Sequence, residues 1–252
     1  MSGHSHWATI KRKKGAVDAK KGKIFSKLAR NITIAAREGG GNPDLNIKLQ
    51  YAIEKAKDAN MPKDNIERAI QKGAGVTAGG EDLYEYLYEG YGPNGVAIMA
   101  EAVTDNRNRT TSEIRKTFER FGGSLGAGGC VSWLFEKRGM FIVDSKKVEE
   151  DKLMVLALEA GAEDVLSVEQ VYQVVCLPSD FDRIRKILKE QDIPFESAEL
   201  TWTPKTSIDV DEATGKRVIA LMEALEDHDD VQGVYANFNL PKDLLLEMQT
   251  KR

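Results

Sequence analysis

Cysteine and histidine are scarce in this sequence, and long apolar runs are missing. Among 252 residues there are 2 Cys and 3 His. Cys130 and Cys176 are too few for a disulfide framework or a cysteine-based zinc site, and no Cys-x-x-Cys occurs. No apolar stretch approaches the roughly 18 residues that a membrane helix needs, and the first residues do not contain the apolar core of a secretory signal. We therefore expect a cytoplasmic protein with no membrane partner.

Motifs of the common catalytic and metal sites are missing as well. The sequence contains neither a Gly-x-Ser-x-Gly elbow nor a convincing Cys–His pair. The glycine-rich segment 122–129 does not have the Lys and Ser or Thr of a P-loop, so we expect a flexible connection there. His4 and His6 have no further ligands on rigid supports, and His228 in EDHDD is expected at a helix end. We predict no catalytic residue, no cofactor and no metal site.

The overall charge of −4 hides a strong asymmetry along the chain. Residues 1–80 contain 16 Lys and Arg against 7 Asp and Glu, a net charge of +9, which leaves −13 on the other 172 residues. Such a split is typical of an arm that binds nucleic acid or another anionic surface, attached to an acidic body. The alternative is that the basic segments are simply solvated helices.

Three amphipathic helices are predicted in the basic part of the chain. Apolar residues recur with a helical period over residues 16–38, and a second helix is expected to begin at Asn42 and Pro43 and to bury Leu45. A third helix follows Pro62 and ends at Gly73. Because each helix has a single apolar face, the three should bury those faces against one another in a small bundle.

After residue 80 the apolar period changes from 3.6 to 2, which indicates strands. Residues 139–202 read as a complete β-α-β-β-α-β unit. A second β-α-β-β-α-β unit is divided between the segments 95–137 and 206–239. In this unit, residues 131–139 and 206–210 are expected to form strands. The predicted fold class is therefore multidomain α and α+β, with a three-helix N-terminal domain and two ferredoxin-like domains, one inserted in the other. The domains proposed are residues 1–79, residues 80–138 with 203–252, and residues 139–202 as the insertion.

The basic arm provides the main candidates for a binding site. Its cations attract phosphate backbones through counterion release, and an indole beside them can stack on an unpaired base. The helix over 16–38 has further cations on the face opposite its apolar stripe. No base-reading helix or zinc-finger spacing accompanies them, so sequence-specific reading is not supported. The candidate residues are Trp7, Lys11, Arg12, Lys13, Lys14, Lys20, Lys21, Lys23, Lys27, Arg30 and Arg37.

Two weaker candidates lie in the acidic part of the chain. Arg107, Arg109 and Arg115 lie at and along a predicted helix, where they could contact phosphates or could serve only as surface charge. Alternation places a row of tyrosines, Tyr84 to Tyr88, on one face of a strand. Exposed aromatics of this kind stack on RNA bases, but rings that cover the sheet or meet another domain are the favoured interpretation.

Five ordered blocks of the sequence resemble the YebC/PmpR family of probable transcriptional regulatory proteins, whose mitochondrial relatives activate translation. His6 stands where the family usually has Lys after GHS, so residue 6 provides a weaker cation. The resemblance spans essentially the whole chain. The blocks are GHSHWATIKRKKGAVDAKKGKIFSKLARNI, MPKDNIERAIQKG, YEGYGPNGVAI, TDNRNRT and LEDHDDVQGVYANF.

The resemblance implies a helical domain followed by two α+β domains, one inserted in the other, and a regulator without enzymatic activity. Two mechanisms remain open. One is a DNA-binding regulator of transcription, which the family name favours. The other is a ribosome-associated factor that contacts ribosomal or transfer RNA and aids synthesis of difficult, proline-rich sequences. The acidic α+β domains are expected to serve as a scaffold or as a surface for a protein partner.

Overall fold

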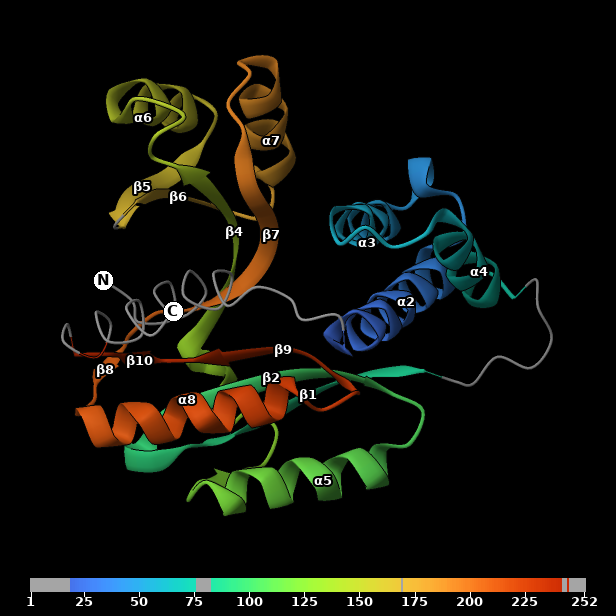
Figure 1. Ribbon diagram of the computed structural model, residues 1–252, viewed down its shortest axis with the longest axis vertical. Helices are drawn as coiled ribbons and strands as arrows, with labels where there is room; N and C mark the ends of the chain where they lie inside the picture. The colour runs from blue at the N-terminus through green and yellow to red at the C-terminus, as the bar shows by residue number, and fades with distance from the viewer. Residues whose placement is uncertain (1–18, 76–82, 169, 242–243, 245–252) are drawn as a thin grey trace.

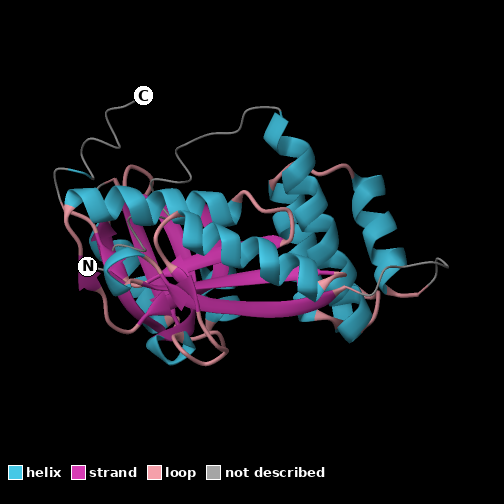
Figure 2. Ribbon diagram, turned by 90° about the horizontal axis from the view of Figure 1, so that it is seen from below, coloured by secondary structure: helices cyan, strands magenta, loops and turns pink. Residues whose placement is uncertain are grey.

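The computed structural model describes residues 19–75, 83–168, 170–241 and 244. They form a helical domain and two α+β bodies with one four-stranded sheet each (Figure 1). Figure 2 shows the three long N-terminal helices grouped at one end of the molecule, beside the strands. Within the described residues, no helix is both long and apolar enough to span a bilayer.

The N-terminal domain contains the predicted three-helix bundle. Its elements are α2 (Ala19–Gly39), the short 3-10 helix η1 (Pro43–Leu45), α3 (Ile47–Asp58) and α4 (Lys63–Gly73). The apolar faces meet in one cluster, as their periodicity predicts. The large buried side chains of this cluster are Leu28, Ile32, Leu49, Ile53, Met61 and Ile66.

The prediction of one helix from Asn42 onward is wrong. Asn42 caps only η1. A second helix, α3, begins after Asn46, whose side chain accepts a hydrogen bond from the Leu49 amide (3.1 Å). The Asn46 amide group also donates to the carbonyls of Ala35 (2.7 Å) and Gly40 (2.8 Å), which ties α3 to the end of α2. Because this cap redirects the chain, Leu45 points outward and is 83% exposed.

The second body is a sheet of order β3-β1-β2-β9 covered on one face by two helices. The elements are β1 (Tyr84–Tyr91), η2 (Pro93–Gly95), β2 (Ala97–Thr104), α5 (Arg107–Arg120), β3 (Ser124–Leu125), α8 (Glu212–Glu226) and β9 (Val231–Ala236). Ile114 and Phe118 of α5 pack with Val218 and Met222 of α8 against this sheet. Residues 93–95 form η2, the turn that joins β1 to β2.

The strand assignment of this second body differs from the prediction. The sheet uses β1 and the very short β3, whereas 206–210 yields only β8 (Ile208–Asp209), which pairs in parallel with β10 (Phe238–Asn239) outside the sheet. Residues 132–134 form a 3-10 turn, η3 (Ser132–Leu134). One edge of the sheet is therefore formed by two residues of the glycine-rich segment, which the strand pattern did not reveal.

The inserted body follows the predicted order of elements. They are β4 (Phe135–Asp144), α6 (Glu150–Glu159), β5 (Ala162–Val168), β6 (Val171–Cys176), α7 (Phe181–Glu190) and β7 (Phe195–Pro204), and the sheet order is β5-β6-β4-β7. The two strands expected on either side of Gly139 are a single strand, because Gly139 is paired with Cys176 and Leu200 in the ladder. A Cβ at Gly139 would lie 2.6 Å from Phe181.

Helix α2 packs on the face of the second sheet opposite α5 and α8 (Figure 1). Alternation along β2 turns Val103 away from the neighbouring Ala102, which faces the helices. On that opposite face Val103 forms a small buried cluster with Ile34 of α2 and Leu83. The basic helix is thereby held against the acidic body.

Gly73 sets the closest approach of α4 to α2. A Cβ at this position would lie 2.2 Å from the carbonyl oxygen of Thr33, so a backbone would have to move. We expect Gly73→Ala to lower the free energy of unfolding by about 2 kcal/mol, the usual cost of overpacking, measured by urea denaturation. Gly22→Ala is the matched control: a Cβ there meets nothing within 4 Å, and the change should stabilise α2. Equal effects of the two changes would contradict this account.

Candidate nucleic-acid interface

Three described cations of α2, Lys23, Lys27 and Arg30, face the turn between α8 and β9. Lys23 forms ion pairs with Asp229 (3.2 Å) and Asp227 (3.7 Å). The ammonium group of Lys27 donates to the carbonyl of Glu226 (2.6 Å). Arg30 donates to the carbonyl of Asp229 (2.7 Å). Three residues that the sequence marked for nucleic acid thus contact the protein's own acidic turn.

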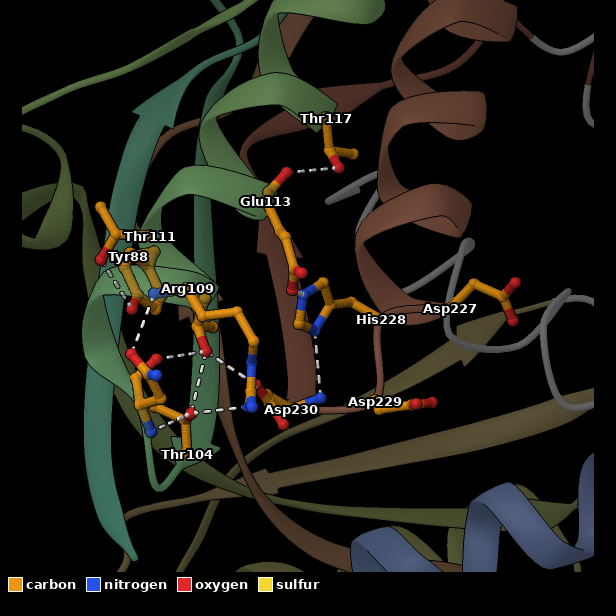
Figure 3. A network of polar contacts seen from close by, with 12 residues as sticks. Tyr88, Thr104, Arg109, Thr111, Glu113, Thr117, Asp227, His228, Asp229 and Asp230 are labelled. Atoms are coloured by element: carbon orange, nitrogen blue, oxygen red, sulfur yellow. Dashed lines mark hydrogen bonds and ion pairs between the residues drawn. The ribbon is translucent and has the colours of Figure 1, made fainter.

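Asp230 joins α2 to α5 through one buried carboxylate. Its side chain is 3% exposed. Oδ1 accepts a hydrogen bond from Arg30 (2.8 Å), and Oδ2 accepts from Arg109 (2.8 Å) and from the Thr110 hydroxyl (2.7 Å). The Thr104 hydroxyl lies 2.8 Å from that of Thr110 (Figure 3). Two guanidinium groups from distant parts of the chain therefore share one carboxylate.

The environment of Asp230 favours its charged form. Burial by itself raises the pKa of this carboxyl. The hydrogen bonds from Thr110 and Arg109, together with the charges of Arg30 and Arg109, outweigh burial and hold the pKa of Asp230 below its ordinary value. The side chain is an ionised structural group.

His228 fixes the backbone of the acidic turn. Its Nδ1 accepts a hydrogen bond from the amide of Asp230 (3.1 Å), so Nε2 is the nitrogen that faces Glu113 of α5, at 2.8 Å (Figure 3). This agrees with the expected helix end, since α8 stops at Glu226. Within the described part of the chain, no group of three His, Cys, Asp or Glu side chains is placed to hold a metal ion.

The arginines of α5 divide into two sets. Arg109 points into the Asp230 network, where it also pairs with Asp105 (3.0 Å). Arg107 lies over the ring of Tyr86, with its guanidinium carbon 5.2 Å from the ring centre. Arg107 and Arg115 line an open pocket of about 380 Å³, and neither has a carboxylate partner among the described residues. The remaining lining residues are Asn108, Thr111 and Ser112.

The row of tyrosines covers the sheet or meets the N-terminal domain. Tyr88 is buried in the core, and its hydroxyl lies 3.1 Å from that of Thr111. Tyr86 is partly buried beside it. Tyr84 is half exposed, but the guanidinium group of Arg37 lies over its ring at 5.3 Å. This arrangement agrees with the favoured interpretation, and Tyr84 is the most exposed of the three tyrosines.

The glycine-rich segment is a structured loop and not the flexible connection that we expected. Glu89 of β1 is 5% exposed, and its carboxylate accepts the amides of Gly129 (2.7 Å), Val131 (2.8 Å) and Ser132 (2.7 Å). Burial raises the pKa of Glu89, but these backbone hydrogen bonds outweigh it and lower the pKa. The backbone amides that could bind a phosphate are thus already bonded to the carboxylate of Glu89.

Sequence reasoning missed the contacts between the N-terminal and inserted bodies. The Tyr51 hydroxyl donates to Asp182, and Lys55 pairs with Glu199 at 3.4 Å. A further ion pair joins Glu54 to Arg185. These pairs are separated by more than 130 positions, so no local pattern could have revealed them.

Some of the predicted binding residues lie outside the described structure. Lys20 and Lys21 belong to the first turn of α2, without described side chains. The other cations of the arm and its indole are not described. These residues are Trp7, Lys11, Arg12, Lys13 and Lys14.

The role of Asp230 predicts a pH dependence. A carboxylate whose pKa is lowered in the folded state adds stability above the unfolded value of about 3.9, and this stability is lost as the pH falls below it. We expect Asp230→Asn to lower the free energy of unfolding by about 3 kcal/mol at pH 7, measured by urea denaturation. The difference between the two proteins should shrink progressively as the pH falls below about 4. A difference that does not change with pH would show that the charge of Asp230 is not what stabilises the turn.

Comparison with known proteins agrees with this architecture. Residues 5–76 match the model of the TACO1/YebC protein N-terminal domain, and residues 83–238 match that of the TACO1/YebC second and third domain. A probable transcriptional regulatory protein of Halothermothrix orenii is 53% identical, with 98% of this chain and 99% of that protein covered. Its counterpart from Syntrophus aciditrophicus is 51% identical, with 97% and 98% covered.

A crystal structure of a conserved hypothetical protein from Aquifex aeolicus has a similar fold. Its TM-score is 0.82 and its sequence is 50% identical, with 90% of this chain and 93% of that chain covered. The family expected from the five sequence blocks is thereby confirmed. The chain belongs to the TACO1/YebC family, whose relatives carry the name probable transcriptional regulatory protein.

Proposed function

We propose that this protein is a cytoplasmic, non-catalytic regulator that binds nucleic acid through its N-terminal domain, with DNA as the nominal target. The observation that carries the proposal is the net charge of +9 on residues 1–80. Seven of these cations fall within residues 11–23. Phosphate backbones bind such clusters with little dependence on sequence. The name that the relatives share supports a role in transcription.

The described surface offers two further places for phosphates. A groove of about 510 Å³ runs between α2 and α4, with Arg30, Arg68 and Lys72 among its lining residues. On α5, Arg107 and Arg115 lie two helical turns apart beside the hydroxyl of Ser112. Guanidinium groups bind phosphate oxygens through paired hydrogen bonds. We therefore treat the α5 pair as a secondary contact and assign Arg109 to the Asp230 network.

Ribosomal or transfer RNA is the alternative target. The basic domain is a bundle of short helices, and the sequence contains no base-reading helix motif or dimer zipper. Contact with a phosphate backbone alone suits structured RNA as well as DNA. In this alternative the protein aids synthesis of difficult sequences on the ribosome, and the acidic bodies contact a protein partner.

Neutralising the arm tests the nucleic-acid proposal. We expect the quadruple change Lys11→Gln, Arg12→Gln, Lys13→Gln and Lys14→Gln to weaken binding to all sequences about equally. The slope of log affinity against log salt should fall by about 0.9 for each phosphate that the arm no longer neutralises. Fluorescence anisotropy with a labelled 30-base-pair DNA duplex and an RNA hairpin measures both quantities. An unchanged slope and affinity would rule out the arm as the binding surface.

The α5 pair allows a comparison on a single helix. Arg107→Gln with Arg115→Gln removes two charges at the pocket, whereas Lys116→Gln with Arg120→Gln removes two exposed charges elsewhere on α5. If α5 contacts phosphate, the first pair lowers the salt slope by about one to two units, since each neutralised phosphate adds about 0.9, and the second lowers it less. If both double variants lower the salt slope equally, α5 contributes only its overall charge and Arg107 and Arg115 form no specific phosphate contact.

Cross-linking in growing cells separates DNA from RNA as the target. The DNA and RNA recovered with the protein are both sequenced. A transcriptional regulator should enrich discrete promoter regions without ribosomal RNA. Recovery of ribosomal and transfer RNA without promoter peaks would overturn the DNA target and favour the ribosomal role.

A further inference from the structure

The basic face of α2 carries a regular row of cations. Lys23, Lys27 and Arg30 follow one another at intervals of four and three residues, so they lie on one side of the helix. Each of the three contacts the turn formed by residues 226–230. The α2 row therefore presents three cations in line, and in this structure the oxygen atoms that they contact belong to the protein.

The acceptors are all oxygen atoms, and several carry charge. Lys23 donates to the carbonyl of Asp227 and pairs with the carboxylates of Asp227 and Asp229. Arg30 contacts a carbonyl and the carboxylate of Asp230. Charged nitrogen donors use the same charge-assisted hydrogen bonds toward carboxylate and phosphate oxygens. A phosphodiester backbone thus offers α2 the chemistry that the acidic turn offers now.

The outer contacts are exposed to water. The side chains of Asp227 and Asp229 are 74% and 71% exposed, and that of Lys23 is 36% exposed. Ion pairs with this exposure are weak and screened by salt. A polyanion with many phosphates can therefore compete with them.

Asp230 makes such an exchange feasible at the buried end of the row. When Arg30 turns to another anion, the carboxylate of Asp230 keeps its hydrogen bonds from Arg109 and Thr110. Both partners belong to α5 and move with the second body. No unpaired buried charge is left behind, so the usual large penalty for breaking a buried ion pair does not arise.

We propose that the acidic turn of residues 226–230 occupies a phosphate-binding face of α2, and that nucleic acid bound along α2 displaces it. The turn acts as an internal competitor that sets the affinity and salt dependence of the N-terminal domain. This inference rests on the proposed function, because it requires that the chain binds nucleic acid.

Zero-length cross-linking reports the contact directly. A carbodiimide joins an ammonium group to a carboxylate that touches it, so Lys23 should become linked to Asp227 or Asp229, and peptide mass spectrometry measures the yield. With a 30-base-pair DNA duplex that has 5′-hydroxyl ends, or an RNA of equal length, at saturation, we expect this yield to fall at least fivefold. Two pairs within single helices serve as internal controls and should not change. They are Lys216–Glu212 in α8 and Lys186–Glu190 in α7.

Each result of this experiment bears on one claim. Saturated binding with an unchanged Lys23 cross-link would overturn the inference while the proposed function stands. Failure of both probes to bind at low salt would overturn the proposed function itself.

A matched pair of variants tests the competition. Asp227→Asn with Asp229→Asn weakens the internal competitor, so affinity for the duplex should rise about three- to tenfold at low salt. Asp151→Asn with Glu159→Gln makes the same charge change at exposed positions of α6, outside the turn. Only a gain in the first variant that exceeds that of the second supports competition. Equal gains would reduce the effect to net charge and overturn the inference.

Discussion

The buried carboxylate of Asp230 is the interaction on which the arrangement of the first two bodies depends. It accepts hydrogen bonds from Arg30 in the N-terminal domain and from Arg109 and Thr110 in α5. A carboxylate with 3% exposure has to be paired, because an isolated buried charge is very costly. This requirement brings α2, α5 and the turn before β9 to one point and holds the basic helix on the acidic body.

The contact between α2 and the acidic turn also explains how the opposite charges behind the net charge of −4 are arranged. The basic and acidic parts of the chain do not only cancel in the total, because the acidic turn lies directly on cations of α2. Part of the positive field of the N-terminal domain is neutralised inside the molecule. The described cations that have no carboxylate partner include Arg107 and Arg115 on α5, in a body whose overall charge is negative.

Glu89 and the acidic turn illustrate one physical rule. Backbone amides and guanidinium groups that converge need an anion, and folding supplies a carboxylate when one is within reach. The Glu89 carboxylate accepts hydrogen bonds from the amides of Gly129, Val131 and Ser132. In the same way, the carboxylates of Asp229 and Asp230 pair with cations of α2. In the described part of this protein, converging cations and backbone amides are thus met by its own carboxylates.

Periodicity and charge counts determined much of this protein from the sequence alone. They yielded the three-helix bundle, the order of elements in the inserted body, the basic N-terminal part and, with the five blocks, the family. These features depend on interactions between near neighbours in sequence. Only the tertiary structure decided that Asn46 restarts a helix, that β3 completes a sheet, and that Lys23, Lys27 and Arg30 face residues 226–230. Each of these depends on groups that folding brings together, and in the last case about 200 residues separate them. A local pattern records that a cation is present, but the partner of that cation is fixed by the packing of the whole chain.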